Sequence, residues 1–197
     1  MSLTFDYKIT IFEKPIHSKI FKFMKDLKKA IRSIPCFPIE TVTFRDITTL
    51  MQDTEAFQEA CNRLYERYKD QKIDKVAGID ARGFVFGAVL AYRLNVGFIP
   101  IRKKGKLPYK TICEKYDLEY GSAEIEVHDD AISKGERVVV VDDLIATGGT
   151  IAAACNLIER LGGIVVECAF IVELPDLKGR EKIKDKKIFT MVEFEGD

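Results

Sequence analysis

The most constraining feature of the sequence is the run Val138–Val141, which leads directly into Asp142 and Asp143 and then into a short loop of glycine and threonine. Four consecutive β-branched residues are typical of a strand that is buried on both faces. Such strands belong to parallel sheets with helices packed on each side. The run therefore predicts an α/β fold with two carboxylates at the carboxyl end of a central strand.

Strand-like and helix-like segments alternate on both sides of this run, which is the βαβα rhythm of a parallel sheet covered on both faces. The chain has 197 residues and a hydrophobic composition of 47%, without any break in composition. We therefore expect a single domain over residues 1–197. The alternating segments are 75–80, 82–94, 97–101, 136–142, 150–161 and 164–174.

Two regions lie outside this rhythm. The first is at the N-terminus, where Pro35 and Pro38 end an amphipathic helical pattern, so residues 1–33 are expected to form a helical extension. The second runs from about residue 103 to 128 and is polar and rich in lysine, as expected of a flap. Between them, Asp53 is expected to cap a helix. The apolar face of that helix consists of Phe57, Cys61, Leu64 and Tyr68.

Charge and cysteine content exclude several classes of protein. Lys plus Arg and Asp plus Glu number 31 each, so the basic footprint of a nonspecific nucleic-acid binder is missing. Five scattered cysteines and two histidines show no metal-ligand spacing. The odd number of cysteines and the lack of a long apolar run predict a cytoplasmic protein that does not enter a membrane.

The segment after the buried run has the chemistry of a ligand site. Ligands of open α/β sheets bind outside the carboxyl ends of the strands. We expect the strand to end at Val141, so that Asp142 and Asp143 lie in the loop that follows, where they could accept hydrogen bonds from neighbouring hydroxyls or hold hydrated Mg²⁺. Backbone N–H groups at a helix N-terminus, together with threonine hydroxyls, favour a phosphate. The loop residues are Ala146, Thr147, Gly148, Gly149 and Thr150, with a helix expected from about Ile151.

Two common phosphate motifs do not match this loop. A P-loop requires a lysine after its last glycine, and none follows Gly149; the dinucleotide pattern GxGxxG is also absent here. An ordinary strand–turn–helix connection remains an alternative, because aspartate and threonine are frequent in turns and helix caps. Two acids, two glycines and two threonines together exceed what such a turn requires.

The whole segment resembles the motif with which type I phosphoribosyltransferases bind 5-phosphoribosyl 1-pyrophosphate (PRPP). The resemblance implies that the loop holds the 5′-phosphate while Asp142 and Asp143 serve the ribose hydroxyls. Mg²⁺ is the implied cofactor; it would arrive with PRPP and contact Asp142 or Asp143 through water. The implied fold is a parallel-sheet core with helices on both faces, a flexible flap and a small N-terminal hood.

Further stretches resemble the adenine-specific branch of this family, and the resemblance covers about residues 34–184. It implies purine salvage, in which adenine and PRPP give AMP and pyrophosphate, by an enzyme that forms a homodimer. The stretches are Phe44–Ile47, Ala81–Phe84, Arg102–Pro108 and Tyr116–Gly121, and the resemblance extends to Glu173–Leu174 and Leu177–Lys182.

The resemblance also assigns roles to single residues. Arg82 and Lys103 are expected to contact the pyrophosphate of PRPP, and the Ala81–Arg82 peptide bond is expected to be cis. The resemblance is weaker for Lys104 and Lys106, which a solvated charge run would equally explain. On the base side, Glu119 is the implied proton handler and Tyr120 closes over the purine. The residues implied to read adenine are Thr43, Phe44 and Arg45.

Two alternatives stay open from the residues alone. One is a phosphoribosyltransferase for a 6-oxopurine, because the PRPP motif does not choose the acceptor base; the Phe44–Arg45 stretch is the discriminator. The other is a noncatalytic PRPP-sensing regulator, which would add a DNA-binding module. No helix-turn-helix pattern or basic patch precedes Ile34, which disfavours the regulator.

Overall fold

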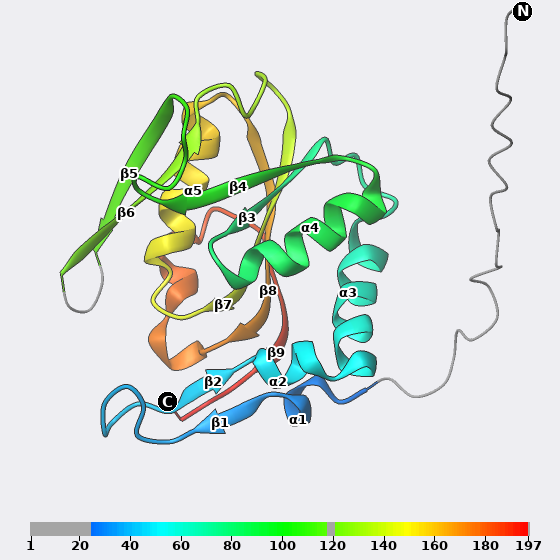
Figure 1. The fold of residues 1–197 in the computed structure, drawn as a ribbon, viewed down its shortest axis with the longest axis vertical. Helices are drawn as coiled ribbons and strands as arrows, with labels where there is room; N and C mark the ends of the chain where they lie inside the picture. The colour runs from blue at the N-terminus through cyan, green and yellow to red at the C-terminus, as the bar shows by residue number, and fades with distance from the viewer. Residues whose placement is uncertain (1–24, 118–120, 197) are drawn as a thin grey trace, which may run out of the picture.

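The computed structural model describes residues 25–117 and 121–196, so the first part of the predicted N-terminal helix lies outside the described residues. A seven-stranded sheet forms the core, with the strand order β5-β6-β4-β3-β7-β8-β9 (Figure 1). The strands are β3 (Lys75–Ile79), β4 (Gly97–Lys103), β5 (Thr111–Asp117), β6 (Ser122–His128), β7 (Arg137–Ile145), β8 (Ile164–Glu173) and β9 (Ile188–Glu193).

The sheet is parallel from β4 to β9, and β5 and β6 extend one edge as an antiparallel hairpin. At its centre, each residue of Val138–Val141 is 0% exposed. Val139 and Val141 face the apolar cluster that includes the helices α3 and α4, whereas Val138 and Val140 face the cluster of α5. Burial on both faces confirms the α/β prediction made from this run.

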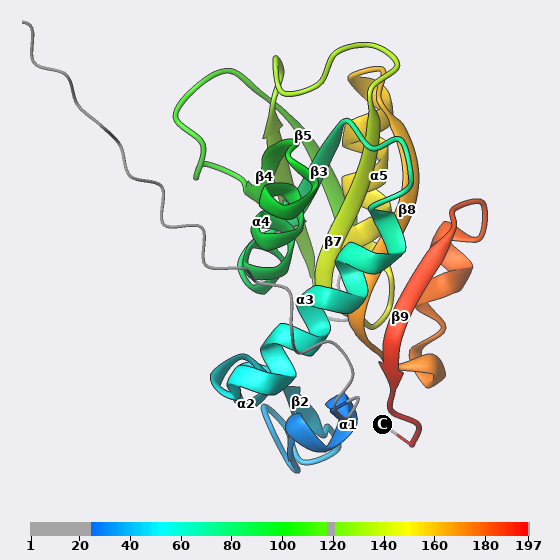
Figure 2. The same ribbon diagram turned by 90° about the vertical axis from the view of Figure 1, so that its right-hand side faces the viewer.

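The helices cover the two faces as this alternation requires. Figures 1 and 2 show α3 and α4 on one side of the sheet and α5 on the other. Asp53 caps α3, since its Oδ1 accepts hydrogen bonds from the backbone N–H groups of Glu55 and Ala56 at 3.0 Å each, which confirms the predicted cap. The bounds are α3 (Thr54–Tyr68), α4 (Arg82–Leu94) and α5 (Gly149–Arg160).

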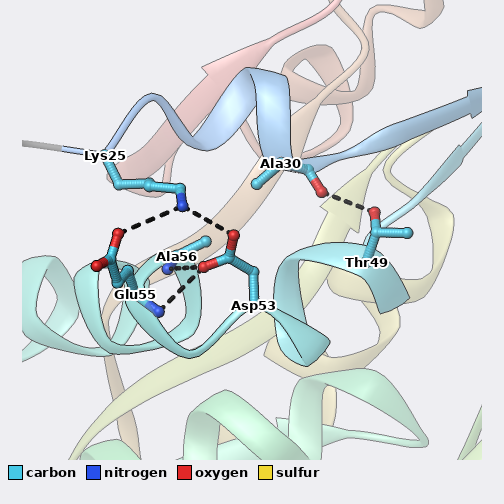
Figure 3. A network of polar contacts seen from close by, with 6 residues as sticks. All are labelled: Lys25, Ala30, Thr49, Asp53, Glu55 and Ala56. Carbon is cyan, nitrogen blue, oxygen red and sulfur yellow. Dashed lines mark hydrogen bonds and ion pairs between the residues drawn. The ribbon is translucent and has the colours of Figure 1, made fainter.

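A small N-terminal unit, residues 25–52, lies at the lower end of Figure 1, beyond the carboxyl end of β7; we call it the hood. The prediction of a helix is wrong over Arg32–Ile34. These residues form a strand that pairs with Phe44–Asp46, and this pairing prevails over the helical spacing of the apolar residues. Figure 3 shows how the hood is held together and attached to α3. The Thr49 hydroxyl donates to the Ala30 carbonyl at 2.7 Å, and Lys25 Nζ lies 2.8 Å from Asp53 Oδ2. The hood contains α1 (Leu27–Ala30), β1 (Arg32–Ile34), β2 (Phe44–Asp46) and α2 (Thr48–Gln52).

Two short 3-10 helices, η1 (Pro175–Leu177) and η2 (Gly179–Ile183), connect β8 to β9. The segment returns beside the carboxyl end of β7, where the Leu174 N–H donates to the Ile145 carbonyl at 3.0 Å. In the part of the chain that the structure describes, no helix has both the length and the apolar character needed to cross a bilayer.

Candidate active site

A cavity of about 210 Å³ lies at the carboxyl end of β7. It is lined by Arg82 and by every residue from Asp142 to Ile151. Arg82 is the first residue of α4, directly after the neighbouring strand β3. Two strand ends and two helix N-termini therefore meet around one hollow, which is the position where parallel α/β sheets bind ligands.

The two carboxylates belong to β7 and not to the loop after it. The expectation that the strand ends at Val141 is wrong, because β8 continues the ladder and pairs Asp142 with Phe170 and Ile145 with Glu173. Successive strand residues point to opposite faces, so the two aspartates have different surroundings. Asp143 is only 7% exposed, whereas Asp142 is half-buried.

The partners of the two carboxylates also differ. Arg82 Nε donates to Asp143 Oδ2 at 2.5 Å, so Asp143 has a cationic partner. Asp142 Oδ1 accepts the backbone N–H of Asp143 at 2.8 Å. Burial, followed by the charge of Asp143, raises the pKa of Asp142 well above its usual range. Asp142 is thus the carboxylate that gains most from a further hydroxyl donor or cation.

Arg82 is held near the carboxylates by the close packing of its helix on β7. A Cβ atom on Gly83 would lie 2.6 Å from the Val141 carbonyl oxygen and 2.9 Å from Asp142 Oδ1, so only glycine fits there. The cis peptide bond expected at Ala81–Arg82 lies one residue earlier, between Asp80 and Ala81.

The segment Ala146–Thr150, which we call the glycine-threonine loop, connects β7 to α5. The helix begins at Gly149, two residues earlier than expected. Gly148 has a φ of 77°, a conformation that favours glycine. Steric crowding also requires glycine at this position, because a Cβ atom on Gly148 would lie 2.3 Å from the carbonyl oxygen of Gly179. Gly148 and Gly149 line the cavity at the start of α5, where backbone N–H groups of a helix N-terminus favour an anion.

Gly179, at the start of η2, supports this loop from behind and was not among the predicted site residues. A Cβ atom on Gly179 would lie 2.2 Å from the Ala146 carbonyl oxygen. The next residue, Arg180, forms two hydrogen bonds of 2.5 Å to the Glu173 carboxylate at the end of β8. This ion pair lowers the pKa of Glu173 and fixes the turn that carries Gly179. The family resemblance includes Leu177–Lys182, but it assigns Gly179 no role, because the support joins residues about 30 positions apart.

The residues implied to read adenine come from the hood. Thr43 precedes β2, and Phe44 and Arg45 lie within it. The Phe44 ring packs edge-on against Phe37 at 5.5 Å between centroids, and Phe37 is 51% exposed. Phe37 was not predicted as a site residue. The Arg45 guanidinium donates to Ser33 Oγ at 2.6 Å and lies 4.4 Å from the ring of Phe194.

Electrostatics connect the hood to the cavity. Burial lowers the pKa of Arg82, but the carboxylates of Asp143, Asp142 and Asp46 together raise it above its ordinary value. Asp46 is the last residue of β2, so the strand that carries Phe44 lies within electrostatic range of Arg82.

Of the remaining predicted residues, the structure describes only Lys103. Lys103 is the last residue of β4, next to β3, and its side chain is exposed. Glu119 and Tyr120 lie outside the described residues, between β5 and β6. The structure therefore brings Arg82, both aspartates and the glycine-threonine loop to one cavity, whereas Thr43–Arg45 lie in the hood and do not line it.

Comparison with known proteins identifies the family. Residues 48–197 match the model of the phosphoribosyl transferase domain. The chain is 66% identical over 172 residues to an adenine phosphoribosyltransferase of Desulfosudis oleivorans, and the match covers 87% of this chain and 99% of the relative. The chain belongs to the adenine phosphoribosyltransferase family.

Solved structures of adenine phosphoribosyltransferases have the same fold. The enzyme of Thermoanaerobacter pseudethanolicus is 47% identical in sequence to this chain, and its structure matches with a TM-score of 0.84. The match covers 87% of this chain and 100% of that enzyme's chain. The enzyme of Saccharomyces cerevisiae, solved with adenine and an imino-altritol bisphosphate, is 40% identical with a TM-score of 0.81; the match covers 86% of this chain and 98% of that one. This agreement confirms the expected type I phosphoribosyltransferase core.

Proposed function

We propose that this chain transfers the 5-phosphoribosyl group of PRPP to adenine, giving AMP and pyrophosphate. The observation that carries the proposal is the single cavity around which Arg82, Asp142, Asp143 and the glycine-threonine loop meet. An anion cradle beside two carboxylates suits a ligand that has a phosphate at one end and neighbouring hydroxyls in its middle. Membership of the adenine phosphoribosyltransferase family supports the same reaction.

Each part of PRPP has a partner in this proposal. The glycine-threonine loop and the N-terminus of α5 bind the 5′-phosphate, to which Thr147 and Thr150 donate. Asp142 accepts hydrogen bonds from the ribose hydroxyls. Arg82 and Lys103 attract the pyrophosphate at the opposite end.

The carboxylates suit the Mg²⁺ that the resemblance implies. Mg²⁺ in proteins is commonly held by one or two carboxylates together with substrate phosphates and water. Asp142, whose pKa is raised by burial and by Asp143, is the better ligand, because the charge of Asp143 is already matched by Arg82. Bound with PRPP, the metal would stabilise the negative charge that develops on the departing pyrophosphate.

Catalysis in this proposal depends on positioning and electrostatics, and no protein nucleophile is needed. The bond between C1′ and the pyrophosphate oxygen breaks, its electron pair leaves with pyrophosphate, and adenine N9 forms the new bond to C1′. N9 transfers its proton to the departing pyrophosphate, while Glu119 in its protonated form donates a hydrogen bond to N7. The β5–β6 hairpin acts as a flap that excludes water, and Tyr120 closes over the purine.

Adenine is read by the backbone of Thr43–Arg45, with Phe44 stacked on or beside the purine. This assignment agrees with the Arg45 side chain, which is directed toward Ser33 and Phe194. Adenine presents a donor at N6 and an acceptor at N1, a pair that one peptide segment can complement. Hypoxanthine reverses both polarities and would leave buried groups unpaired.

We therefore expect the enzyme to prefer adenine over hypoxanthine and guanine by at least about 10²-fold in kcat/KM. Initial rates of pyrophosphate release from PRPP with each base measure this preference, and chromatography of the products identifies AMP. Rates with hypoxanthine or guanine within a few fold of adenine would instead favour the 6-oxopurine enzyme. Tight binding of PRPP without release of pyrophosphate in the presence of any of the bases would favour a noncatalytic regulator.

We further propose that the enzyme acts as a homodimer in the cytoplasm. Tyr92 and Val85 on α4 are 86% and 39% exposed, which provides apolar area for contact with a second copy. All five cysteines are free thiols, which agrees with a reducing compartment. Light scattering after size exclusion tests the dimer, and a Tyr92→Asp variant that stays dimeric would argue against α4 as the contact.

A further inference from the structure

The segment after β4 is a tight turn of basic residues, Lys103–Pro108, which we call the basic loop. Gly105 has a φ of 81°, and the Lys106 N–H donates to the Lys103 carbonyl at 3.3 Å. The Lys104 N–H donates to the Glu124 carbonyl of β6 at 3.1 Å. The loop therefore has a defined shape and lies against the neighbouring strand.

A buried carboxylate lies directly beneath this loop. Glu126 of β6 is 3% exposed, at the position where β6 pairs with both β4 and β5. Its Oε1 accepts the backbone N–H groups of Lys106 and Leu107 at 2.8 Å each, and its Oε2 accepts the Thr111 hydroxyl at 3.2 Å. Burial raises the pKa of Glu126, but the hydrogen bonds from the loop backbone and from Thr111 together hold it below its usual range.

The opposite side of the loop is held by Arg102. Its Nη1 donates to the Lys106 carbonyl at 3.1 Å, and its Nε donates to Asp80 Oδ2 at 3.2 Å. The N–H and the carbonyl of Lys106 are thus both occupied. Asp80 lies two residues before Arg82, so Arg102 connects the basic loop to the turn that carries Arg82.

This arrangement leaves particular ammonium groups available. Lys104 forms an ion pair with Glu124. Lys103 and Lys106 are exposed and have no ion pair with a carboxylate among residues 25–117 and 121–196. Because Glu126 binds backbone N–H groups, its charge does not pair with these lysines. The loop therefore presents two ammonium groups without a carboxylate partner among the described residues, and Arg102 joins this loop to Asp80 in the turn before Arg82.

We propose that Glu126 is a positioning residue that holds the basic loop in the shape in which Lys103 and Lys106 meet the pyrophosphate of PRPP. The inference rests on the proposed function and adds a residue to it that contacts no substrate. A glutamine at this position retains a carbonyl oxygen for the N–H groups of Lys106 and Leu107, and its amide can donate to Thr111. An alanine has neither an acceptor for these N–H groups nor a partner for Thr111.

Steady-state kinetics of Glu126→Ala, Glu126→Gln and Glu124→Ala test this role. Loss of two hydrogen bonds to a charged acceptor predicts that Glu126→Ala raises the KM for PRPP by about 10- to 100-fold, with the KM for adenine nearly unchanged. Glu126→Gln should recover most of the loss. Glu124→Ala is the matched control, because it lies on the same strand and bonds to a lysine side chain. An equal rise in both KM values, or an equal effect of Glu124→Ala, would overturn the proposal.

Two binding measurements separate positioning from general destabilisation. In titrations with Mg²⁺ present, Glu126→Ala should weaken binding of pyrophosphate and leave binding of ribose 5-phosphate within about twofold, whereas a structural role would weaken both. Hydrogen exchange at the Lys106 and Leu107 amides should become faster in this variant. Unchanged exchange at these amides would contradict the role of Glu126.

If Glu126→Ala does not fold, Arg102→Leu releases the Lys106 carbonyl from the other side and should cause the same selective loss of pyrophosphate binding. Equal loss of both ligands in Arg102→Leu would overturn the proposal. Failure of the proposed function is distinguishable, because the wild-type chain would then bind PRPP without releasing pyrophosphate, or would release pyrophosphate with hypoxanthine or guanine as fast as with adenine. Hydrogen exchange would still report whether Glu126 orders the loop.

Discussion

Gly179→Ala is expected to weaken the binding of ribose 5-phosphate by at least about 10²-fold, because misplacement of a binding group by 1 Å has effects of this size. The new Cβ atom would lie 2.2 Å from the Ala146 carbonyl oxygen and 2.9 Å from Ile145 Cγ1. The first of these contacts is with backbone, so the glycine-threonine loop itself must move. Calorimetric titration with ribose 5-phosphate measures the loss.

Gly97→Ala is the matched control for this variant, since its Cβ atom would meet only the Lys75 side chain at 3.8 Å or more. Thermal melting of both variants shows whether the fold is retained. A folded Gly179→Ala protein that binds ribose 5-phosphate as tightly as the wild type would contradict the role of Gly179 as the support of the loop.

Replacing Asp142 or Asp143 by asparagine is expected to reduce kcat/KM for PRPP by about 10- to 150-fold, the size of a lost hydrogen bond to a charged group. The two variants should differ in the ligand that they lose. Asp142→Asn keeps an amide oxygen that can accept a hydrogen bond, but it removes the negative charge that favours the ribose hydroxyls and Mg²⁺, so ribose 5-phosphate binding should weaken. Asp143→Asn releases Arg82, which it holds at 2.5 Å, so pyrophosphate binding should weaken.

Kinetics and titrations of both variants across a range of Mg²⁺ concentrations measure these effects. Because burial and Asp143 raise the pKa of Asp142, lowering the pH should weaken ribose 5-phosphate binding to the wild type more than to Asp142→Asn, in which only the phosphate of the ligand still titrates. Wild-type behaviour of both variants at every Mg²⁺ concentration would show that the carboxylates are structural.

The fold could be predicted from the sequence where local pattern and tertiary environment agree. Val138–Val141 has the composition of a doubly buried strand, and both of its faces are covered. Asp53 could be recognised as a cap because its partners are two and three residues away. Arg32–Ile34 could not be predicted, because its strand conformation depends on pairing with Phe44–Asp46 across a loop.

The candidate site could be predicted only in part for a similar reason. The glycine-threonine loop and the two aspartates are contiguous, so their chemistry is visible in one segment. The partnership of Arg82 with Asp143 joins residues 61 positions apart, and the contact between Gly148 and Gly179 is also distant in sequence. Glu126 was missed because its partners are backbone N–H groups of a turn, which have no sequence signature.

In the proposed complex, PRPP is divided between two adjacent sites. The 5′-phosphate and ribose bind at the glycine-threonine loop and Asp142, and the pyrophosphate binds at Arg82 and Lys103. The most direct measurement is a titration of the wild-type protein with pyrophosphate and Mg²⁺ in the presence of saturating ribose 5-phosphate. Simultaneous binding is predicted, with a pyrophosphate affinity similar to that of the free protein. Mutual exclusion of the two ligands would contradict this division of PRPP.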